Sequence, residues 1–201
     1  MENFKAGTVS IIGKPNTGKS TLINTITGRK ISAVSDKPNT TRNKILGVLN
    51  SKDSQMLFLD TPGLQKSNKF LNRIMVQSSM QAISEADVIL VMIDGTKKFS
   101  EDDLNLFDKI KDKNPIVAIN KIDLIKKSRI LGLIENLSSK YDFVENFIPI
   151  SALNNEGTNL LLDKLKENLP FDEKILPDDT LTCLLYTSDA ADEGLGVDLG
   201  G

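Results

Sequence analysis

The sequence predicts a three-layer α/β fold, in which a six-stranded, mostly parallel sheet carries helices on both faces. Short apolar runs alternate with amphipathic segments along the chain, which is the pattern of β–α units around such a sheet. Hydrophobic residues make up 39% and charged residues 26% of the 201 residues, as is typical of a globular protein. The length suits one main domain. We expect this domain to span residues 1–170, with an interdomain linker over 171–182.

The individual elements follow from where the apolar residues recur. Strands are expected over 8–12, 44–49, 55–59, 88–93, 116–119 and 147–150, and helices over 19–27, 70–84, 102–111, 128–140 and 159–169. The second and third strands are close enough for a hairpin, so one strand is expected to be antiparallel at the sheet edge. In the last helix we expect Leu160, Leu161, Leu165 and Leu169 to form the buried stripe.

Composition excludes several classes of function. The chain has no histidine, which excludes Ser–His and Cys–His nucleophilic mechanisms, and the single Cys183 provides neither a disulfide nor a metal cluster. The apolar runs are shorter than the roughly 20 residues that span a bilayer, and the first residues lack a secretion signal. We therefore expect a cytoplasmic protein. The net charge of -2 is too small to indicate a nucleic-acid partner.

Residues 13–20 match the phosphate-binding loop pattern, in which Gly13 and Gly18 are followed by Lys19 and Ser20. A predicted strand enters the loop and a predicted helix leaves it, so backbone N–H groups and the helix N-terminus can converge on phosphate oxygens. We expect Lys19 to reach the β and γ phosphates and Ser20 to bind magnesium. The expected nucleotide-binding residues of this segment are Gly13, Asn16, Thr17, Gly18, Lys19, Ser20 and Thr21.

A second motif, Asp60-Thr-Pro-Gly63, follows the predicted strand over 55–59. Taken alone, such a stretch is most often a turn. The carboxyl ends of parallel strands meet at one edge of a doubly wound sheet, however, so the phosphate loop upstream favours a functional interpretation. We expect Asp60 to hold magnesium through water.

A third motif, Asn120-Lys121-Ile-Asp123, follows the predicted strand over 116–119. The Asp123 carboxylate can accept two hydrogen bonds from the N1 and N2 edge of guanine, a donor pair that adenine lacks. Sites built around such paired polar contacts reject analogues by factors of about 10⁴ or more. We therefore expect Asp123 to set base specificity. Beside it, the segment Ser151, Ala152 and Leu153 can present a backbone N–H to the guanine O6.

Together these motifs resemble those of the translation-factor-related P-loop GTPases and, within them, the bacterial Era family. The family-specific residues are 30–35, Pro38-Asn-Thr-Thr-Arg42, 44–47 and 60–64, and the similarity runs from about Thr8 to Thr182. The resemblance implies a molecular switch that binds GTP or GDP with magnesium and hydrolyses GTP. It also implies that Thr41 closes on magnesium and the γ phosphate, with Thr40 as the second candidate, and that Gly63 is drawn to the same phosphate. The alternative is that both threonines bond their own backbone.

Two positions refine the expected hydrolysis. Signalling GTPases place a water-orienting glutamine directly after the second motif, where this chain has Leu64, so we expect slow intrinsic turnover. Asn16 matches an asparagine that supports potassium in related GTPases without that glutamine, and a cation there would offset transition-state charge. The alternative is that Asn16 is a turn residue that tolerates the loop geometry.

The resemblance also bears on partners. Era proteins act in small ribosomal subunit assembly and contact 16S rRNA through a C-terminal KH domain, for which we find no counterpart in this sequence. Residues 183–201 resemble the translation of a transposon-based sequencing adapter, and we expect them to be non-native, disordered read-through; a native Gly- and Asp-rich tail is the alternative. We expect a monomer, and the resemblance leaves peripheral membrane association open.

Two other functions remain open from the sequence. The domain could belong to another ribosome-assembly GTPase or to a tRNA-modifying GTPase. It could also be an interaction module that works by nucleotide occupancy alone, with negligible turnover.

Overall fold

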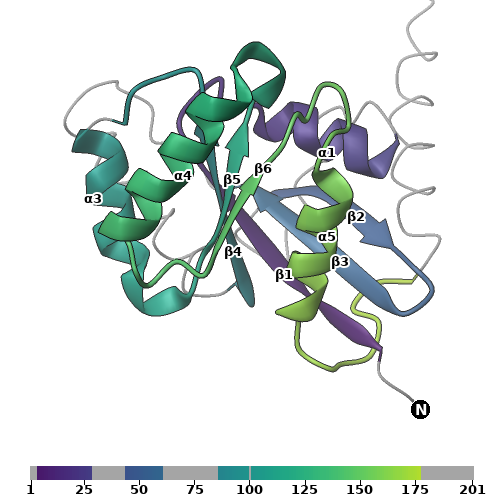
Figure 1. Ribbon diagram of the computed structural model, residues 1–201. Helices are drawn as coiled ribbons and strands as arrows, with labels where there is room; N and C mark the ends of the chain where they lie inside the picture. Colours follow the sequence, from purple (N-terminus) through teal and green to yellow (C-terminus); the bar gives the residue numbers. More distant parts are fainter. Residues whose placement is uncertain (1–3, 29–43, 61–85, 100, 178–201) are drawn as a thin grey trace, which may run out of the picture.

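The computed structural model describes residues 4–28, 44–60, 86–99 and 101–177. In this part of the chain one six-stranded sheet has the order β2-β3-β1-β4-β5-β6 (Figure 1). Its neighbours are parallel except for β2 and β3, which form an antiparallel hairpin at the sheet edge. The predicted fold class and the predicted hairpin are both confirmed. The strands are β1 (Lys5–Ile12), β2 (Lys44–Asn50), β3 (Ser54–Asp60), β4 (Val88–Asp94), β5 (Ile116–Asn120) and β6 (Asn146–Pro149).

Helices cover both faces of the sheet, α1 and α5 on one side and α3 and α4 on the other (Figure 1). Their bounds are α1 (Lys19–Thr27), α3 (Glu101–Ile110), α4 (Lys127–Lys140) and α5 (Thr158–Glu167), with short 3₁₀ turns η1 (Lys111–Lys113) and η2 (Ile122–Leu124). No helix in the described ranges is long and apolar enough to cross a membrane. The predicted helix over 70–84 and the predicted tail over 183–201 lie outside the described residues.

The central strands are buried on both faces, which explains their uninterrupted apolar runs. All seven residues of β4 are buried, and its side chains alternate between two cores. Leu90 and Met92 belong to the core beneath α1 and α5, whereas Val91 and Ile93 belong to the core beneath α3 and α4. Parallel strands covered by helices on both sides require this continuous hydrophobicity.

Helix α5 corrects one expectation. Leu161 and Leu165 are buried as predicted, and so is Leu169, which lies just beyond the end of α5 at Glu167; but Leu160 is 54% exposed, and Leu162 instead packs partly buried against the core. Successive residues of an α-helix lie 100° apart around its axis, so a stripe centred near Leu161 and Leu165 can include only one of the flanking leucines. The tertiary arrangement selects Leu162.

The segment after α5 folds back along the sheet as far as it is described. Phe171 forms an antiparallel bridge with Lys5 at the start of β1. Farther along, the Leu176 backbone is held by the buried Gln55 of β3, whose Nε2 donates to the Leu176 oxygen at 2.7 Å and whose Oε1 accepts from the Leu176 nitrogen at 2.8 Å. Residues that we predicted as the start of an interdomain linker therefore contact the amino ends of the strands, and the domain boundary itself stays a prediction.

Candidate functional site

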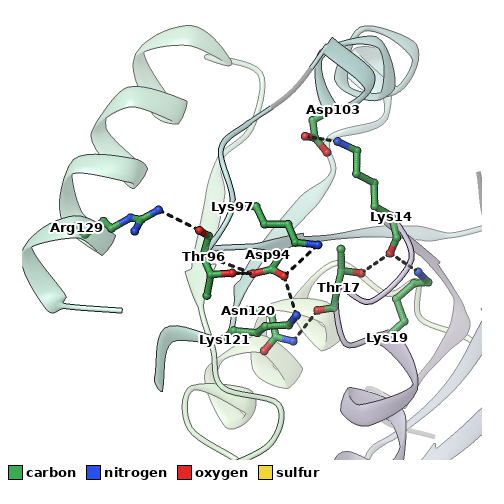
Figure 2. A network of polar contacts seen from close by, with 10 residues as sticks. All are labelled: Lys14, Thr17, Lys19, Asp94, Thr96, Lys97, Asp103, Asn120, Lys121 and Arg129. Atoms are coloured by element: carbon green, nitrogen blue, oxygen red, sulfur yellow. Dashed lines mark hydrogen bonds and ion pairs between the residues drawn. The ribbon is translucent and has the colours of Figure 1, made fainter. Parts of the chain in front are cut away.

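Three loops meet at the carboxyl ends of the strands. They follow β1, β5 and β6, and they contain the predicted phosphate-binding loop, the Asn120–Asp123 segment and the Ser151–Leu153 segment respectively. The sheet order, in which only β4 separates β1 from β5 and β6 lies beside β5, puts them at one edge. Figure 2 shows the polar contacts that join the first two loops. In open α/β sheets this edge is where ligands bind.

The phosphate-binding loop is closed around the Lys19 amine. Lys19 Nζ donates to the backbone oxygens of Gly13 at 2.8 Å and Lys14 at 2.9 Å, and the Thr17 hydroxyl donates to the same Lys14 oxygen at 2.9 Å. Helix α1 begins at Lys19, and its N-cap residue Gly18 has no side chain to accept from the first-turn N–H groups. A cationic amine beside a helix N-terminus without a side-chain cap is a favourable environment for phosphate.

Backbone crowding explains both glycines of this loop. A Cβ on Gly13 would lie 2.4 Å from the Met92 backbone oxygen, and a Cβ on Gly18 would lie 2.2 Å from Asn120 Nδ2. Gly18 also has a φ of 100°, a conformation that L side chains rarely adopt. Asn16 has a φ of 65°, which asparagine tolerates better than most residues. This turn geometry is compatible with an asparagine at position 16, and the expected potassium role of Asn16 stays a prediction.

The Asn120 side chain joins all three loops. Its Nδ2 donates to the Thr17 backbone oxygen at 2.7 Å, and its Oδ1 accepts from the Ala152 N–H at 2.9 Å. Asn120 is only 3% exposed, so each of these partners would be left unpaired in a dry environment if the amide were removed. The Ala152 carbonyl in turn accepts from the Thr25 hydroxyl of α1 at 2.7 Å. Asn120 therefore acts as a clamp on the loops, a role that the sequence motif does not reveal.

The next residue, Lys121, is paired with a buried carboxylate. Lys121 Nζ lies 2.7 Å from Asp94 Oδ2, and the Asp94 side chain is 3% exposed. Burial raises the pKa of Asp94, but hydrogen bonds from Lys121 and Thr96 more than offset this, and the net pKa lies below its ordinary value. Asp94 is therefore a carboxylate at neutral pH.

A second ion pair joins the phosphate-binding loop to α3. Lys14 Nζ lies 2.6 Å from Asp103 Oδ2, and the Asp103 side chain is 12% exposed (Figure 2). This contact fixes the N-terminal part of α3 against the loop that follows β1. Both residues make further interactions besides this one.

The remaining predicted residues are placed as follows. Ser20 and Thr21 are exposed in the first turn of α1, and Asp123 is exposed in η2. Asp60 ends β3, where its backbone pairs with Ile11 beside the phosphate-binding loop. Thr40, Thr41, Gly63 and Leu64 lie outside the described residues.

The residues of the Ser151–Leu153 segment differ in their exposure to solvent. Ser151 is fully buried, whereas Leu153 is 75% exposed. The Ala152 N–H, which we expected as one candidate donor to a base oxygen, already donates to Asn120. The predicted contact between this loop and the base stays a prediction, and of these residues Leu153 is the one most open to solvent.

Sequence reasoning missed Asp94 and the pair of Lys14 and Asp103. Asp94 carried a usable signal, because it ends an apolar strand just as Asp60 and Asn120 do, and all three stand at the ligand-binding edge. Asp103 carried none, since an aspartate in the first turn of a helix is ordinary. Its pairing with Lys14 spans 89 positions of the chain.

Comparisons with known proteins agree with this geometry. A family model described as 50S ribosome-binding GTPase matches residues 8–121. The chain is 40% identical over 181 residues to GTPase Era of Syntrophus aciditrophicus (strain SB), and the match covers 89% of this chain and 59% of that protein.

Two solved structures are similar over 88% of this chain and 61% of theirs. One is a variant of Aquifex aeolicus Era bound to GDP.AlF4-, at 40% identity with a TM-score of 0.76. The other is Era in complex with MgGDPNP and nucleotides 1506–1542 of 16S ribosomal RNA, at 41% identity with a TM-score of 0.77. The chain therefore spans about 60% of the length of the relatives it matches.

Proposed function

The chain belongs to the 50S ribosome-binding GTPase family, and on that premise we propose that it binds GTP with magnesium and hydrolyses it slowly as an Era-like molecular switch. One observation carries the proposal. The buried Asn120 amide bonds to both the predicted phosphate-binding loop and the Ala152 loop, and this contact between predicted phosphate-binding and base-binding segments supports a single nucleotide site. A separate role for any one of these motifs would not require that junction.

The phosphate end of the site is supplied by the loop over 13–18 and by α1. Backbone N–H groups and Lys19 would bind the β and γ phosphates, and the Lys19 amine, now bonded to loop carbonyls, would turn to the ligand. Ligand binding would thus replace the hydrogen bonds that Lys19 donates to the Gly13 and Lys14 backbone oxygens.

The hydroxyl of Ser20, exposed in the first turn of α1 beside the predicted phosphate-binding loop, fits a magnesium ion of the phosphate-bound kind. Among the described residues no three His, Cys, Asp or Glu side chains gather to form a protein-only metal site. Magnesium accepts few protein ligands and completes its shell with water and substrate phosphates. Ser20, Asp60 and Thr41 would hold the ion, which when bound neutralises charge on the phosphates.

The base end is supplied by the segment after β5. Asp123 is exposed in η2 and would accept from the guanine N1 and N2 groups, while the side chain of Asn120 fixes the start of that segment against Thr17. Adenine offers no matching donor pair, so its binding would leave the Asp123 carboxylate unsatisfied.

The hydrolysis step is expected to be slow. Leu64 cannot orient a water molecule as glutamine does in signalling GTPases, and Thr41 and Gly63 would provide the γ-phosphate contacts of the switch. We further propose that potassium accelerates turnover through Asn16. Steady-state rates measured in KCl and in NaCl at equal ionic strength test this; equal rates would contradict the potassium role and leave the GTPase assignment intact.

For the longer protein to which a chain of this kind corresponds, we propose a role in small ribosomal subunit assembly as a cytoplasmic monomer. The Era structure with 16S rRNA supports the partner. Co-sedimentation with small subunits, with GTP or GDP present, tests it. Added lipid vesicles test peripheral membrane association, and light scattering tests the monomer.

The defining experiment compares GTP, ATP and xanthosine triphosphate binding to the parent chain and to Asp123→Asn. We expect the parent to bind GTP at least 100-fold more tightly than ATP, and the variant to prefer the xanthine nucleotide, because its amide donates where the carboxylate accepted. Equal binding of ATP and GTP by the parent would contradict the base assignment.

Multiple-turnover phosphate release then separates an enzyme from a module that works by occupancy. Release of many equivalents of phosphate per chain supports the GTPase. Binding without turnover would support the occupancy module.

A further inference from the structure

We propose that Asp94 is a positioning residue of the guanine site, which acts through Lys121 to set how long the nucleotide stays bound. The inference rests on the proposed function, because Lys121 belongs to the predicted base-binding segment. Asp94 itself lies at the end of β4, the strand that the described sheet places between β1, which leads into the predicted phosphate-binding loop, and β5, which leads into that segment.

The Asp94 carboxylate uses its two oxygens for two tasks. Oδ1 accepts from the Thr96 N–H at 3.0 Å and from the Thr96 hydroxyl at 2.5 Å, which fixes the turn that follows β4. Oδ2 accepts from Lys121 Nζ at 2.7 Å. The first pair of bonds orients the carboxylate and leaves the second oxygen aimed at Lys121 (Figure 2).

The turn after β4 is also held by contacts with α4 and β5. Arg129 of α4 donates to the Thr96 backbone oxygen at 3.1 Å, and the Gly95 N–H donates to the Asn120 backbone oxygen at 2.9 Å. Asp94 and Asn120 are direct partners in the register of β4 and β5. These bonds fix the turn that follows β4, so the Asp94 carboxylate has a defined position beside Asn120 from which it can hold the Lys121 amine.

Lys121 needs such an anchor because of its backbone. It has a φ of 68°, in the left-handed region that costs free energy for a residue with a side chain. A flexible lysine side chain in solvent would also lose conformational entropy when a nucleotide packs against it. Because Asp94 holds the Lys121 amine, part of that entropy loss is already incurred within the protein itself.

A neighbouring lysine provides a contrast. Lys97 Nζ lies 3.9 Å from the same carboxylate oxygen, but its side chain is 65% exposed, against 29% for Lys121. An exposed pair at that distance contributes little. Lys121 is thus the partner through which Asp94 acts.

The test is a double-mutant cycle on the full chain, with the dissociation rate of fluorescently labelled GDP as the readout. The variants are Asp94→Asn, Lys121→Met and the double variant. We expect Asp94→Asn to raise the dissociation rate about tenfold, which is a typical consequence of losing a buried charge-assisted hydrogen bond. If Asp94 acts through Lys121, the double variant will dissociate no faster than Lys121→Met alone.

Rates that multiply in the double variant would overturn the proposal, because they would show that Asp94 acts independently of Lys121. Unchanged dissociation in Asp94→Asn would overturn it as well. Should Asp94→Asn fail to fold, the same cycle is run with Asp94→Glu, which keeps the charge but moves it by one methylene, and the same lack of additivity is expected.

Two matched controls separate positioning from general effects of charge. Lys97→Met removes the exposed partner of the same carboxylate, and Asp53→Asn breaks an aspartate–lysine pair at the opposite end of the sheet. We expect both to leave the GDP dissociation rate within twofold of the parent. A tenfold change in either control would contradict the assignment to the pair of Asp94 and Lys121.

The proposal and the function fail in distinguishable ways. If the parent chain binds no guanine nucleotide, the proposed function fails. If the parent binds GDP but the effects of the two substitutions on the dissociation rate are independent, the proposed GTPase function is kept and the positioning role of Asp94 is wrong.

Discussion

The two ends of the central sheet contain the same kinds of contact in different surroundings. At the carboxyl end, Asp94 pairs with Lys121, and the two side chains are 3% and 29% exposed; at the amino end, Asp53 pairs with Lys166, and the exposures are 58% and 34%. Each end also has a buried side-chain amide that holds a distant backbone, Asn120 at one and Gln55 at the other.

The difference shows which contacts can serve function. An exposed ion pair contributes little to stability because water and salt screen it. A buried carboxylate pays a desolvation cost, so it is kept only where precise partners surround it. At the amino end, the Gln55 amide therefore stabilises the structure, whereas the exposed ion pair contributes little to stability. The carboxyl end uses both contacts to fix the loops of the site.

Asn120→Ala should have the largest effect, because it leaves the Thr17 oxygen and the Ala152 N–H without their buried partner. We expect a loss of about 3 kcal/mol in the free energy of unfolding and a fall of at least about 100-fold in GTP affinity. Urea denaturation and equilibrium titration measure the two. A stable variant with parent-like affinity would show that the loops come together without the clamp.

Gly18→Ala should have the second-largest effect, because the added Cβ would lie 2.2 Å from Asn120 Nδ2. Gly28→Ala is the matched control, because Gly28 has a similar positive φ of 67°, but among the described residues only its own chain neighbours lie within 4 Å of the added Cβ. We expect the control to lose only the roughly 1 kcal/mol of left-handed strain and to keep its GTP affinity. Gly18→Ala should lose both stability and binding. Equal losses in the two variants would mean that strain, and not the clamp, explains Gly18.

Gln55→Ala tests the contacts at the amino end of the sheet. The variant releases the Leu176 backbone and leaves the Asn50 side chain without its 2.8 Å bond to Gln55 Nε2. We expect roughly 2 kcal/mol of lost stability. GTP affinity should stay within twofold, because these contacts are at the end of the sheet opposite the site. A large loss of affinity would mean that the hairpin of β2 and β3 transmits the change to the site.

The pH dependence of stability should report the contribution of Asp94 at the carboxyl end. The pKa of Asp94 is lowered below 3.8, so the charged form favours the folded state, and its contribution is present above pH 3.8 and is lost as the pH falls further. The stability difference between the parent and Asp94→Asn should therefore be constant near pH 6 to 7 and shrink below about pH 3.8. A difference that grew with acid would contradict the sign of the shift.

Asp53→Asn should have the smallest effect. The Lys166 hydrogen bond lowers the pKa of Asp53, but the pair is open to solvent. We expect unfolding midpoints within error of the parent in 1 M NaCl and at most a slight decrease at low salt. A salt-resistant loss would show that the pair is structural after all.

The sequence by itself determined the fold class, and it predicted the residues of the candidate site. Alternating apolar runs predicted all six strands, because strands covered on both faces must be apolar throughout, and the described helices followed from their 3.6-residue spacing. The phosphate-binding loop was recognisable because its glycines, lysine and hydroxyl residue act within eight consecutive residues, so no long-range information was needed.

Only the tertiary structure decided how these parts are joined. Asn120 bonds to Thr17 across 103 positions and to Ala152 across 32, and Gln55 bonds to Leu176 across 121. The same holds for the choice of Leu162 over Leu160 in α5. Such contacts depend on the spatial order of the strands, which local periodicity does not contain. The physical reason is that a buried polar group must find a partner, and the partner is whichever group the folded sheet brings within hydrogen-bond distance.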